Sequence, residues 1–205
     1  MNPVAPPASP TTQLGGLFFR YRDVLPVPLA LLMVKVARPR ALNWLIGLPL
    51  VFLGELVRLW GLRYIGPTTR TRDICADRLV TGGPYARVRH PLYLANALKV
   101  LGLLVIAGHL PFALLTLAFY ALEFVTMIPF EEQFLEQKFP EAFALYKEAV
   151  PVFLPNGSVF NSDFEAHFTW TEALRSERRT FMSTGLILGV LGLAGLFRGL
   201  PVERS

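Results

Sequence analysis

Arg78-Leu-Val-Thr-Gly-Gly-Pro-Tyr-Ala-Arg-Val-Arg-His-Pro-Leu-Tyr93 is a basic, turn-rich stretch that lies between two long apolar parts of the sequence. Its Gly-Gly-Pro turn signal exposes backbone amides, and the Arg, His and Tyr side chains that follow supply hydrogen-bond donors and aromatic rings. Such side chains are also common where a membrane helix meets water. We therefore interpret the stretch either as a simple interfacial turn or as part of a site for a charged, amphipathic ligand.

The composition is that of an integral membrane protein. Of the 205 residues, 53% are hydrophobic and 17% are charged, and the mean hydropathy is +0.44, values outside the usual range of soluble domains. The net charge of +5 comes from basic residues beside apolar runs, which favours anionic membrane lipids over nucleic acid as a partner. The single cysteine, Cys75, excludes an internal disulfide, and the three scattered histidines predict no metal site.

The apolar runs predict an all-α membrane bundle of about five transmembrane helices. The predicted spans are residues 24–37, 41–64, 92–107, 112–130 and 181–197. The third and fourth spans form a hairpin whose turn has no Lys or Arg, whereas basic residues flank its other end, so the positive-inside rule makes that other end cytoplasmic. An amphipathic helix along the cytoplasmic interface is predicted over residues 131–146.

Residues 1–13 are predicted to be a disordered tail, because they lack the basic and then apolar order of a signal peptide. Residues 14–205 then form a single membrane domain. In the last span Gly185 and Gly189 are four residues apart, a spacing that suits close helix packing within the monomer or, alternatively, in a homodimer.

Two sets of charged residues belong to the predicted spans or their ends. Glu131 and Glu132 follow the hairpin directly and are expected on the same side of the membrane as the basic stretch. Glu55 and Arg58 are three residues apart on one helical face. They form either an ion pair that neutralises itself or the polar wall of a buried site, because ionisable groups in spans usually face a cavity or a partner.

The order of these motifs resembles a known family. Leu79-Val-Thr-Gly-Gly-Pro-Tyr85 is followed by Arg89-His-Pro-Leu-Tyr93, a membrane hairpin, Glu131-Glu132, and Tyr146 ahead of Val150-Pro151. Over residues 58–155 this series resembles the isoprenylcysteine carboxyl methyltransferase family and its phospholipid methyltransferase relatives. The resemblance implies an integral membrane enzyme that uses S-adenosylmethionine without a Rossmann sheet, and the sequence indeed has no Gly-x-Gly-x-x-Gly after a predicted strand.

The resemblance also implies the cofactor contacts: Asp77, Arg78, Leu79, Val80, Tyr85, His90, Pro91, Leu92, Tyr93 and Glu131. Physical chemistry agrees, because a carboxylate such as Glu131 can hold the cofactor's α-ammonium and the amides at the start of a helix can hold its carboxylate. The candidate catalytic residues are Arg89 and Glu132. Glu123 is an alternative base for an acceptor that must first lose a proton.

The acceptor implied by the resemblance is lipophilic, with carboxyl O-methylation of an isoprenylcysteine-like or other lipid as the first reading. The family is expected to hold the substrate carboxylate with a cation shortly before the Glu pair, but this chain has Met127 there, which argues against a prenylcysteine. The family's usual glycine after the second Tyr is Ala95 here. The candidate acceptor-binding residues are Met127, Glu55, Arg58, Asn96 and Lys99, of which the last two are possible replacements for the missing cation.

Three alternatives remain open from the sequence. One is a methyltransferase that acts on an amine or thiol of a phospholipid or small hydrophobic molecule. The others are of a different class: a non-catalytic membrane scaffold, or a small transporter that uses Glu55, Arg58 and Glu123 as a polar path. The expected partners are membrane lipids and a lipophilic substrate, and the protein is expected to be a monomer or homodimer.

Overall fold

The computed structural model describes residues 10–66 and 77–199. Within these residues the chain forms seven α-helices and one 3-10 helix and contains no strand, which confirms the all-α prediction. The helices are α1 (Pro10–Tyr21), α2 (Pro26–Val36), α3 (Ala41–Ile65), η2 (Gly83–Ala86), α4 (Pro91–Ala107), α5 (Leu110–Lys138), α6 (Pro140–Ala149) and α7 (Trp170–Gly199).

Three of the described helices are long and apolar enough to cross a membrane, namely α3, α5 and α7. The other two predicted spans correspond to α2 and α4, which have 11 and 17 residues. At 1.5 Å per residue they reach only about 16 and 26 Å, against about 30 Å of hydrocarbon. The structure therefore supports a membrane protein with three helices of spanning length, and the count of five stays a prediction.

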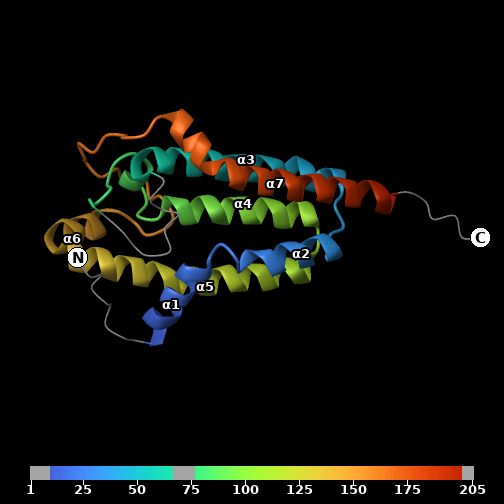
Figure 1. Ribbon diagram of the computed structural model, residues 1–205, viewed down its shortest axis with the longest axis horizontal. Coiled ribbons are helices and arrows are strands. Elements are labelled where there is room, and N and C mark those ends of the chain that lie inside the picture. The colour runs from blue at the N-terminus through green and yellow to red at the C-terminus, as the bar shows by residue number, and fades with distance from the viewer. Residues whose placement is uncertain (1–9, 67–76, 200–205) are drawn as a thin grey trace, which may run out of the picture.

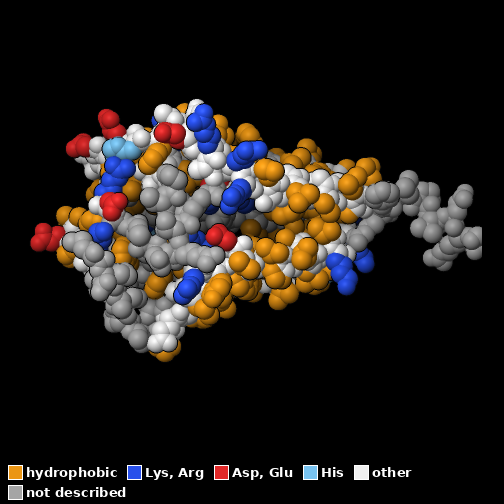
Figure 2. All heavy atoms as spheres, in the orientation of Figure 1, with side chains coloured by type: hydrophobic (Ala, Val, Ile, Leu, Met, Phe, Trp, Pro, Cys, Tyr) orange, Lys and Arg blue, Asp and Glu red, His pale blue; other side chains and the backbone are white. Residues whose placement is uncertain are grey.

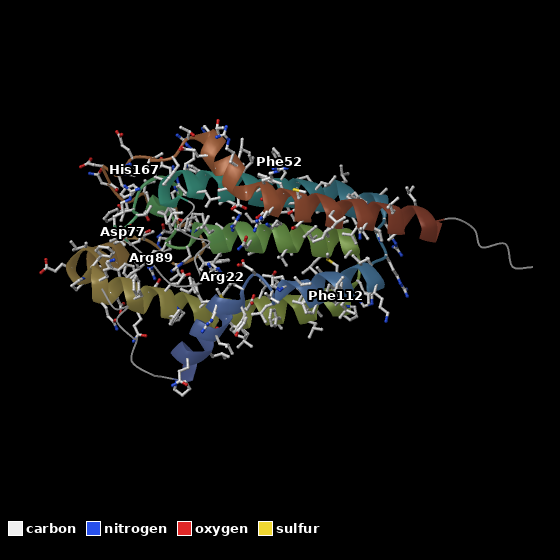
Figure 3. All side chains as sticks on the ribbon, in the orientation of Figure 1. Arg22, Phe52, Asp77, Arg89, Phe112 and His167 are labelled. Carbon is white, nitrogen blue, oxygen red and sulfur yellow. The ribbon has the colours of Figure 1, made fainter. Side chains whose placement is uncertain are left out.

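The helices α2, α3, α4, α5 and α7 run along the long axis of the molecule (Figure 1). The helices η2 and α6 and the irregular segment 150–169 lie together at one end, which we call the polar end. Hydrophobic side chains cover the surface over the length of the bundle, whereas charged side chains gather mainly towards the polar end (Figure 2). Asp77 and Arg89 lie at this end and Phe112 lies towards the other (Figure 3).

Glycines allow α3 and α4 to pack with their backbones in contact. A Cβ added at Gly54 would lie 2.6 Å from the carbonyl oxygen of Ala95, and one at Gly47 would lie 2.5 Å from that of Gly102. Ala95 itself is buried at 1% exposure. The small side chain that replaces the family's glycine thus does permit the close packing expected of it.

Replacing Gly54 with Ala is expected to destabilise the fold by about 1–3 kcal/mol, because backbone atoms of α4 cannot move aside as a flexible side chain can. Gly189 on α7 is the matched control, since a Cβ there meets nothing within 4 Å. Gly189→Ala should be neutral or stabilising by up to about 1 kcal/mol through helix propensity. Thermal unfolding of both variants in one detergent compares them, and equal melting temperatures would contradict the packing described here.

Three boundaries differ from the sequence-based prediction. The fourth predicted span does not end at residue 130: α5 continues to Lys138 with Pro129 inside it, because a proline removes one helical hydrogen bond without necessarily ending a long helix. The interfacial helix is consequently split, and its second part is α6. Residues 10–13, predicted as disordered, belong to α1, while residues 1–9 lie outside the described residues.

The predicted packing role of Gly185 and Gly189 within the monomer is wrong. A Cβ added at either position meets nothing within 4 Å. Large side chains of the same helix are also exposed, such as Leu186 at 69% and Leu196 at 71%. This part of α7 therefore faces outward, as a surface that contacts lipid would.

Candidate active site

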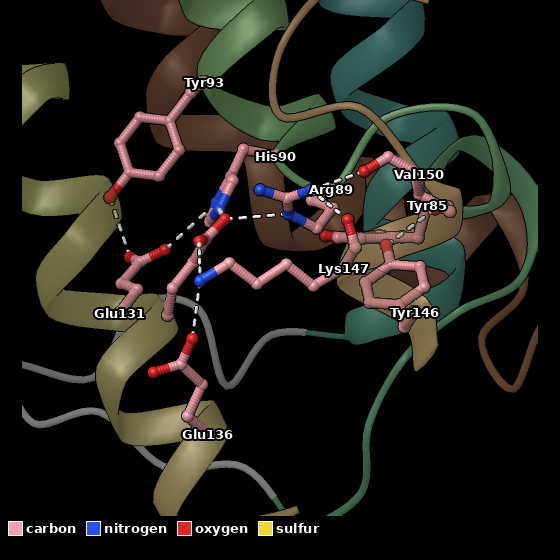
Figure 4. A network of polar contacts seen from close by, with 10 residues as sticks. Tyr85, Arg89, His90, Tyr93, Glu131, Glu136, Tyr146, Lys147 and Val150 are labelled. Atoms are coloured by element: carbon pink, nitrogen blue, oxygen red, sulfur yellow. Dashed lines mark hydrogen bonds and ion pairs between the residues drawn. The ribbon is translucent and has the colours of Figure 1, made fainter. Parts of the chain in front are cut away.

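The turn that precedes α4 is fixed by a glycine. Gly83 has a φ of +59°, and a Cβ added there would lie within 2.4 Å of two ring carbons of Tyr64, so both the backbone conformation and the space favour glycine. The turn places Tyr85 in the interior at 6% exposure. The hydroxyl of Tyr146, from α6, donates to the carbonyl oxygen of Tyr85 at 2.7 Å (Figure 4).

The segment after α6 holds the start of α4 in place. The amide of Arg89 donates to the carbonyl oxygen of Pro151 at 2.9 Å, and the amide of His90 donates to that of Val152 at 3.2 Å. His90 then becomes the residue before α4, and Pro91 fills the first helical position, where its missing N–H costs least. The side chain of His90 makes no capping hydrogen bond. It is free to contact α5 instead.

The two adjacent carboxylates of α5 meet the start of α4 (Figure 4). The hydroxyl of Tyr93 donates to Oε1 of Glu131 at 2.7 Å. The two ring nitrogens of His90 face different carboxylates: Nδ1 lies 3.5 Å from Oε2 of Glu131, and Nε2 lies 3.1 Å from Oε1 of Glu132. The structure therefore joins four predicted site residues that are about 40 positions apart in the sequence.

The two carboxylates differ in their surroundings. The side chain of Glu132 is 10% exposed and is held by Arg89, whose Nε donates to Oε1 at 2.8 Å, and by Lys147 at 3.6 Å. The side chain of Glu131 is more accessible, at 23% exposure. Glu131 is thus the member of the pair that can accept hydrogen bonds from a ligand without first losing a buried ion pair.

Arg89 connects three parts of the site. Besides its ion pair with Glu132, its Nη1 donates to the backbone carbonyl oxygens of Lys147 and Val150 at the end of α6. A guanidinium with several protein acceptors has a fixed orientation. In the described part of the chain, Arg89 therefore orients Glu132 and the segment after α6, and its catalytic role stays a prediction.

Burial and hydrogen bonding change the pKa values of groups at the polar end. Burial of the His90 imidazole lowers its pKa, but the hydrogen bonds and charges of Glu131 and Glu132 outweigh burial and leave the pKa above 6.5. Burial raises the pKa of Tyr85 well above 10 and also that of Tyr146. The imidazole is therefore favoured in its charged form, and both phenols are neutral.

The folded protein is expected to lose stability as the pH rises above about 6.5, because His90 binds its proton more tightly when folded than when unfolded. The contribution is complete below the unfolded pKa and is lost as the pH passes through the folded pKa. Thermal unfolding at about pH 6 and about pH 8.5 measures it, at values on both sides of the ordinary histidine pKa. His90→Gln should show a smaller change between the two pH values than the wild type.

The exposed His167 is the matched control for this measurement, since it lies outside the network of carboxylates and packs edge-on against Phe164. His167→Gln should keep the wild-type pH dependence. A pH dependence that is the same in all three proteins would show that His90 does not carry it.

The remaining predicted cofactor contacts are less closely gathered. Asp77 and Arg78 are exposed, and the guanidinium of Arg78 lies 5.0 Å from the ring centroid of Phe164. Leu79 packs against the buried cluster of Phe143, Tyr146 and Val150, and Leu92 packs against a cluster contributed by α3 and α7. Val80 is half-buried and Pro91 is buried. The described contacts thus join His90, Tyr93 and Glu131, and they tie Tyr85 to Tyr146 instead.

A second polar cluster joins α3, α4 and α7. Arg58 donates from Nε and Nη2 to the two carboxylate oxygens of Glu177 at 2.9 and 3.2 Å, and from Nη1 to Asn96 at 3.1 Å. Nζ of Lys99 lies 3.4 Å from Oε1 of Glu55. Four predicted acceptor-binding residues therefore share this cluster, and the described contacts tie them to α7 rather than to Glu131.

This cluster decides between the two interpretations of Glu55 and Arg58. They do not pair with each other: Arg58 pairs with Glu177, and Glu55 accepts from Lys99 and from the hydroxyl of Thr184 at 3.0 Å. The sequence missed Glu177 because it precedes the apolar run of the last span, although α7 begins at Trp170. Sequence-based prediction also missed Lys147 and Glu136. No motif marks either residue, and only their helical spacing could have indicated where they lie.

Met127 occupies the position before the carboxylate pair that lacks a cation. It is buried at 3% exposure and lies one helical turn before Glu131 on α5. One further turn away lies Glu123, which is also buried, at 4% exposure. The face of α5 that leads into the membrane from Glu131 thus carries a thioether and then a carboxylate.

The class of protein follows from a family comparison. The model of the family described as Phospholipid methyltransferase matches residues 42–142, about half of the chain, from α3 into α6. This segment contains Tyr85, His90, Tyr93 and both carboxylates, and its match to that family confirms the resemblance seen in the sequence.

Two named relatives extend the comparison. The Cobalt-zinc-cadmium resistance protein CzcN of Cupriavidus metallidurans is 36% identical over 146 residues, which cover 71% of this chain and 62% of the relative. The Nickel-cobalt-cadmium resistance protein NccN of Alcaligenes xylosoxydans xylosoxydans is 28% identical over 158 residues, 76% of this chain and 71% of the relative. The chain therefore spans about three fifths of the length of the first relative. No solved structure matches it.

Proposed function

We propose that the protein is a multi-pass membrane methyltransferase that uses S-adenosylmethionine and transfers its methyl group to a lipophilic acceptor. The observation that carries the proposal is the accessible Glu131 carboxylate, held by Tyr93 and His90 at the end of a membrane hairpin within the matched family segment. Groups of both signs lie around it, since Arg89 and Lys147 stand beside the two carboxylates, so a zwitterionic amino-acid moiety fits there better than a simple anion.

The residues present suit each charged part of that cofactor. Glu131 would accept hydrogen bonds from the α-ammonium, and the first amides of α4, which have no side-chain cap, would donate to the carboxylate. The rings of Tyr93 and Tyr85 would face the sulfonium or the adenine. Bound there, the cofactor supplies an electrophilic methyl carbon, and the protein's own task is to align the acceptor and exclude water.

The proposed site faces the cytoplasm, because basic residues flank this end of the hairpin of α4 and α5, whereas the turn at its other end has no Lys or Arg. The acceptor would enter between helices from the lipid, as its apolar part requires. For the acceptor group two chemistries are proposed. Carboxyl O-methylation follows the resemblance, whereas the absence of a cation at Met127 favours a second candidate, an amine or thiol acceptor.

Calorimetry of S-adenosylmethionine with the purified protein tests the proposal. Binding that is saturable at or below millimolar cofactor supports it, and no binding at that concentration would favour the scaffold or transporter alternatives. Transfer of radiolabelled methyl groups to membrane lipid extracts then identifies the acceptor.

Prenylcysteine analogues are expected to be poor acceptors, because Met127 offers no charge to their carboxylate. Efficient turnover of one of them would show that another residue supplies the cation.

A further inference from the structure

Glu123 is a buried carboxylate inside a helix of spanning length. It is 4% exposed, and its Oε1 has no hydrogen-bond partner in the described part of the chain. An ionisable group in a membrane span is costly, and it usually faces a cavity, a pathway or a ligand. Among residues 10–66 and 77–199, Glu123 has no ion pair comparable to those of Glu55, Glu132 and Glu177.

Glu123 lies on the same face of α5 as the proposed cofactor contact. Residues 123, 127 and 131 are spaced by four, so they form one row on the helix, and the row extends about 12 Å at 1.5 Å per residue. Tyr93 of α4 faces this part of α5, because its hydroxyl donates to Glu131 at 2.7 Å and its ring packs edge-on against that of Phe124, the residue after Glu123. The carboxylate therefore lies on the membrane side of the site, where a lipophilic acceptor would arrive.

The neighbouring side chains are aromatic. The ring of Phe124 lies 5.2 Å from that of Tyr93 and 6.0 Å from that of Tyr120, measured between centroids. These rings line the part of α5 that also carries Glu123, and aromatic faces together with a carboxylate are a combination that binds ammonium groups. Arg22 lies at the turn between α1 and α2 (Figure 3). Its Nη1 donates to the carbonyl oxygen of Phe19 at 2.8 Å, and its guanidinium lies 3.9 Å from the centroid of that ring.

We propose that Glu123 binds the ammonium group of the methyl acceptor and takes up its proton. This inference rests on the proposed function. An N–H bond of the acceptor breaks and its proton moves to the Glu123 carboxylate, which leaves an electron pair on nitrogen. That pair forms the new N–C bond as the bond between the methyl carbon and the sulfonium sulfur breaks, and the electrons of the broken bond stay on sulfur. Atoms and charge balance, and no further reactant is needed.

The test compares Glu123→Gln with the wild type in lipid nanodiscs, using dodecylamine as the probe. Calorimetry without cofactor should show dodecylamine binding weakened at least about tenfold in the variant, because a charge-assisted hydrogen bond is lost. The affinity for S-adenosylmethionine should change less than about twofold, since Glu131 and His90 are intact. Where Gln lowers the yield of folded protein, Glu123→Met provides an apolar side chain of similar size.

Two further variants sharpen the comparison. Glu123→Asp keeps the charge and should recover part of the affinity for dodecylamine, and Glu141→Gln, on the exposed surface of α6, should match the wild type. Radiolabelled methyl transfer to dodecylamine should fall by about 100-fold or more in Glu123→Gln, the scale of a lost general base.

The outcomes separate this inference from the proposed function. Equal dodecylamine affinity in the wild type and Glu123→Gln, or no dodecylamine binding by the wild type, overturns the role of Glu123 even if S-adenosylmethionine binds. Failure of the wild type to bind S-adenosylmethionine overturns the proposed function instead. Weaker dodecylamine binding with unchanged cofactor affinity supports both.

Discussion

Glu131→Ala is expected to weaken S-adenosylmethionine binding by about tenfold to a hundredfold. A hydrogen bond between charged groups contributes about 1.5–3 kcal/mol, and each 1.4 kcal/mol corresponds to a factor of ten in affinity. Glu131 would supply such bonds to the ligand, because its side chain is 23% exposed and already oriented by Tyr93 and His90. Isothermal titration calorimetry in detergent micelles measures the change.

Glu141→Ala is the matched control for this experiment. Glu141 carries the same charge and lies on the exposed surface of α6, outside the described contacts of the carboxylate pair. It should bind the cofactor as the wild type does. His90→Ala should resemble Glu131→Ala, since His90 contacts both carboxylates. If both site variants bind with wild-type affinity, the cofactor lies elsewhere.

Glu177→Ala is expected to destabilise the fold by about 3–5 kcal/mol, the cost of leaving one member of a buried ion pair without its partner. The side chain of Glu177 is 0% exposed and accepts two hydrogen bonds from Arg58, whose side chain is 16% exposed. Reversible unfolding in mixed micelles measures the free energy. Glu148→Ala, on the exposed surface of α6, should change it by less than about 0.5 kcal/mol.

A double variant separates the ion pair from a simple loss of packing. Arg58→Leu with Glu177→Leu removes both charges, and it should be more stable than either single substitution because no buried charge is left alone. Stabilities that simply add would show that the two side chains act independently, contrary to the geometry.

The helical class and the position of the site could be predicted because both depend on local patterns. Apolar runs of spanning length gave α3 and α5, and the turn signal before Tyr85 gave the irregular segment that starts the site. The meeting of His90 with Glu131 followed from placing both at one end of a hairpin. The same reasoning missed the continuation of α5 through Pro129. A proline leaves one backbone carbonyl of the helix without its hydrogen bond, and the cost of this loss depends on the groups around that carbonyl, which the sequence does not show.

Contacts between distant helices could not be predicted. Glu55 and Arg58 looked like partners because helical spacing is the only geometry that a single sequence shows directly. Their actual partners, Lys99 and Glu177, depend on how α4 and α7 pack against α3, and the glycines at 47 and 54 set only the close approach of α4. The orientation of Gly185 and Gly189 away from the bundle has the same origin, since a pattern of small residues does not say which helix it meets.

The pairing of Arg58 with Glu177 also orders events during synthesis. The two residues are 119 positions apart. At about 5–20 residues per second, Glu177 is therefore synthesised about 6–24 s after Arg58. During that time a charged guanidinium sits in a helix that must otherwise enter lipid. Arrival of α7 neutralises it, so the last of the described helices completes the membrane integration of α3.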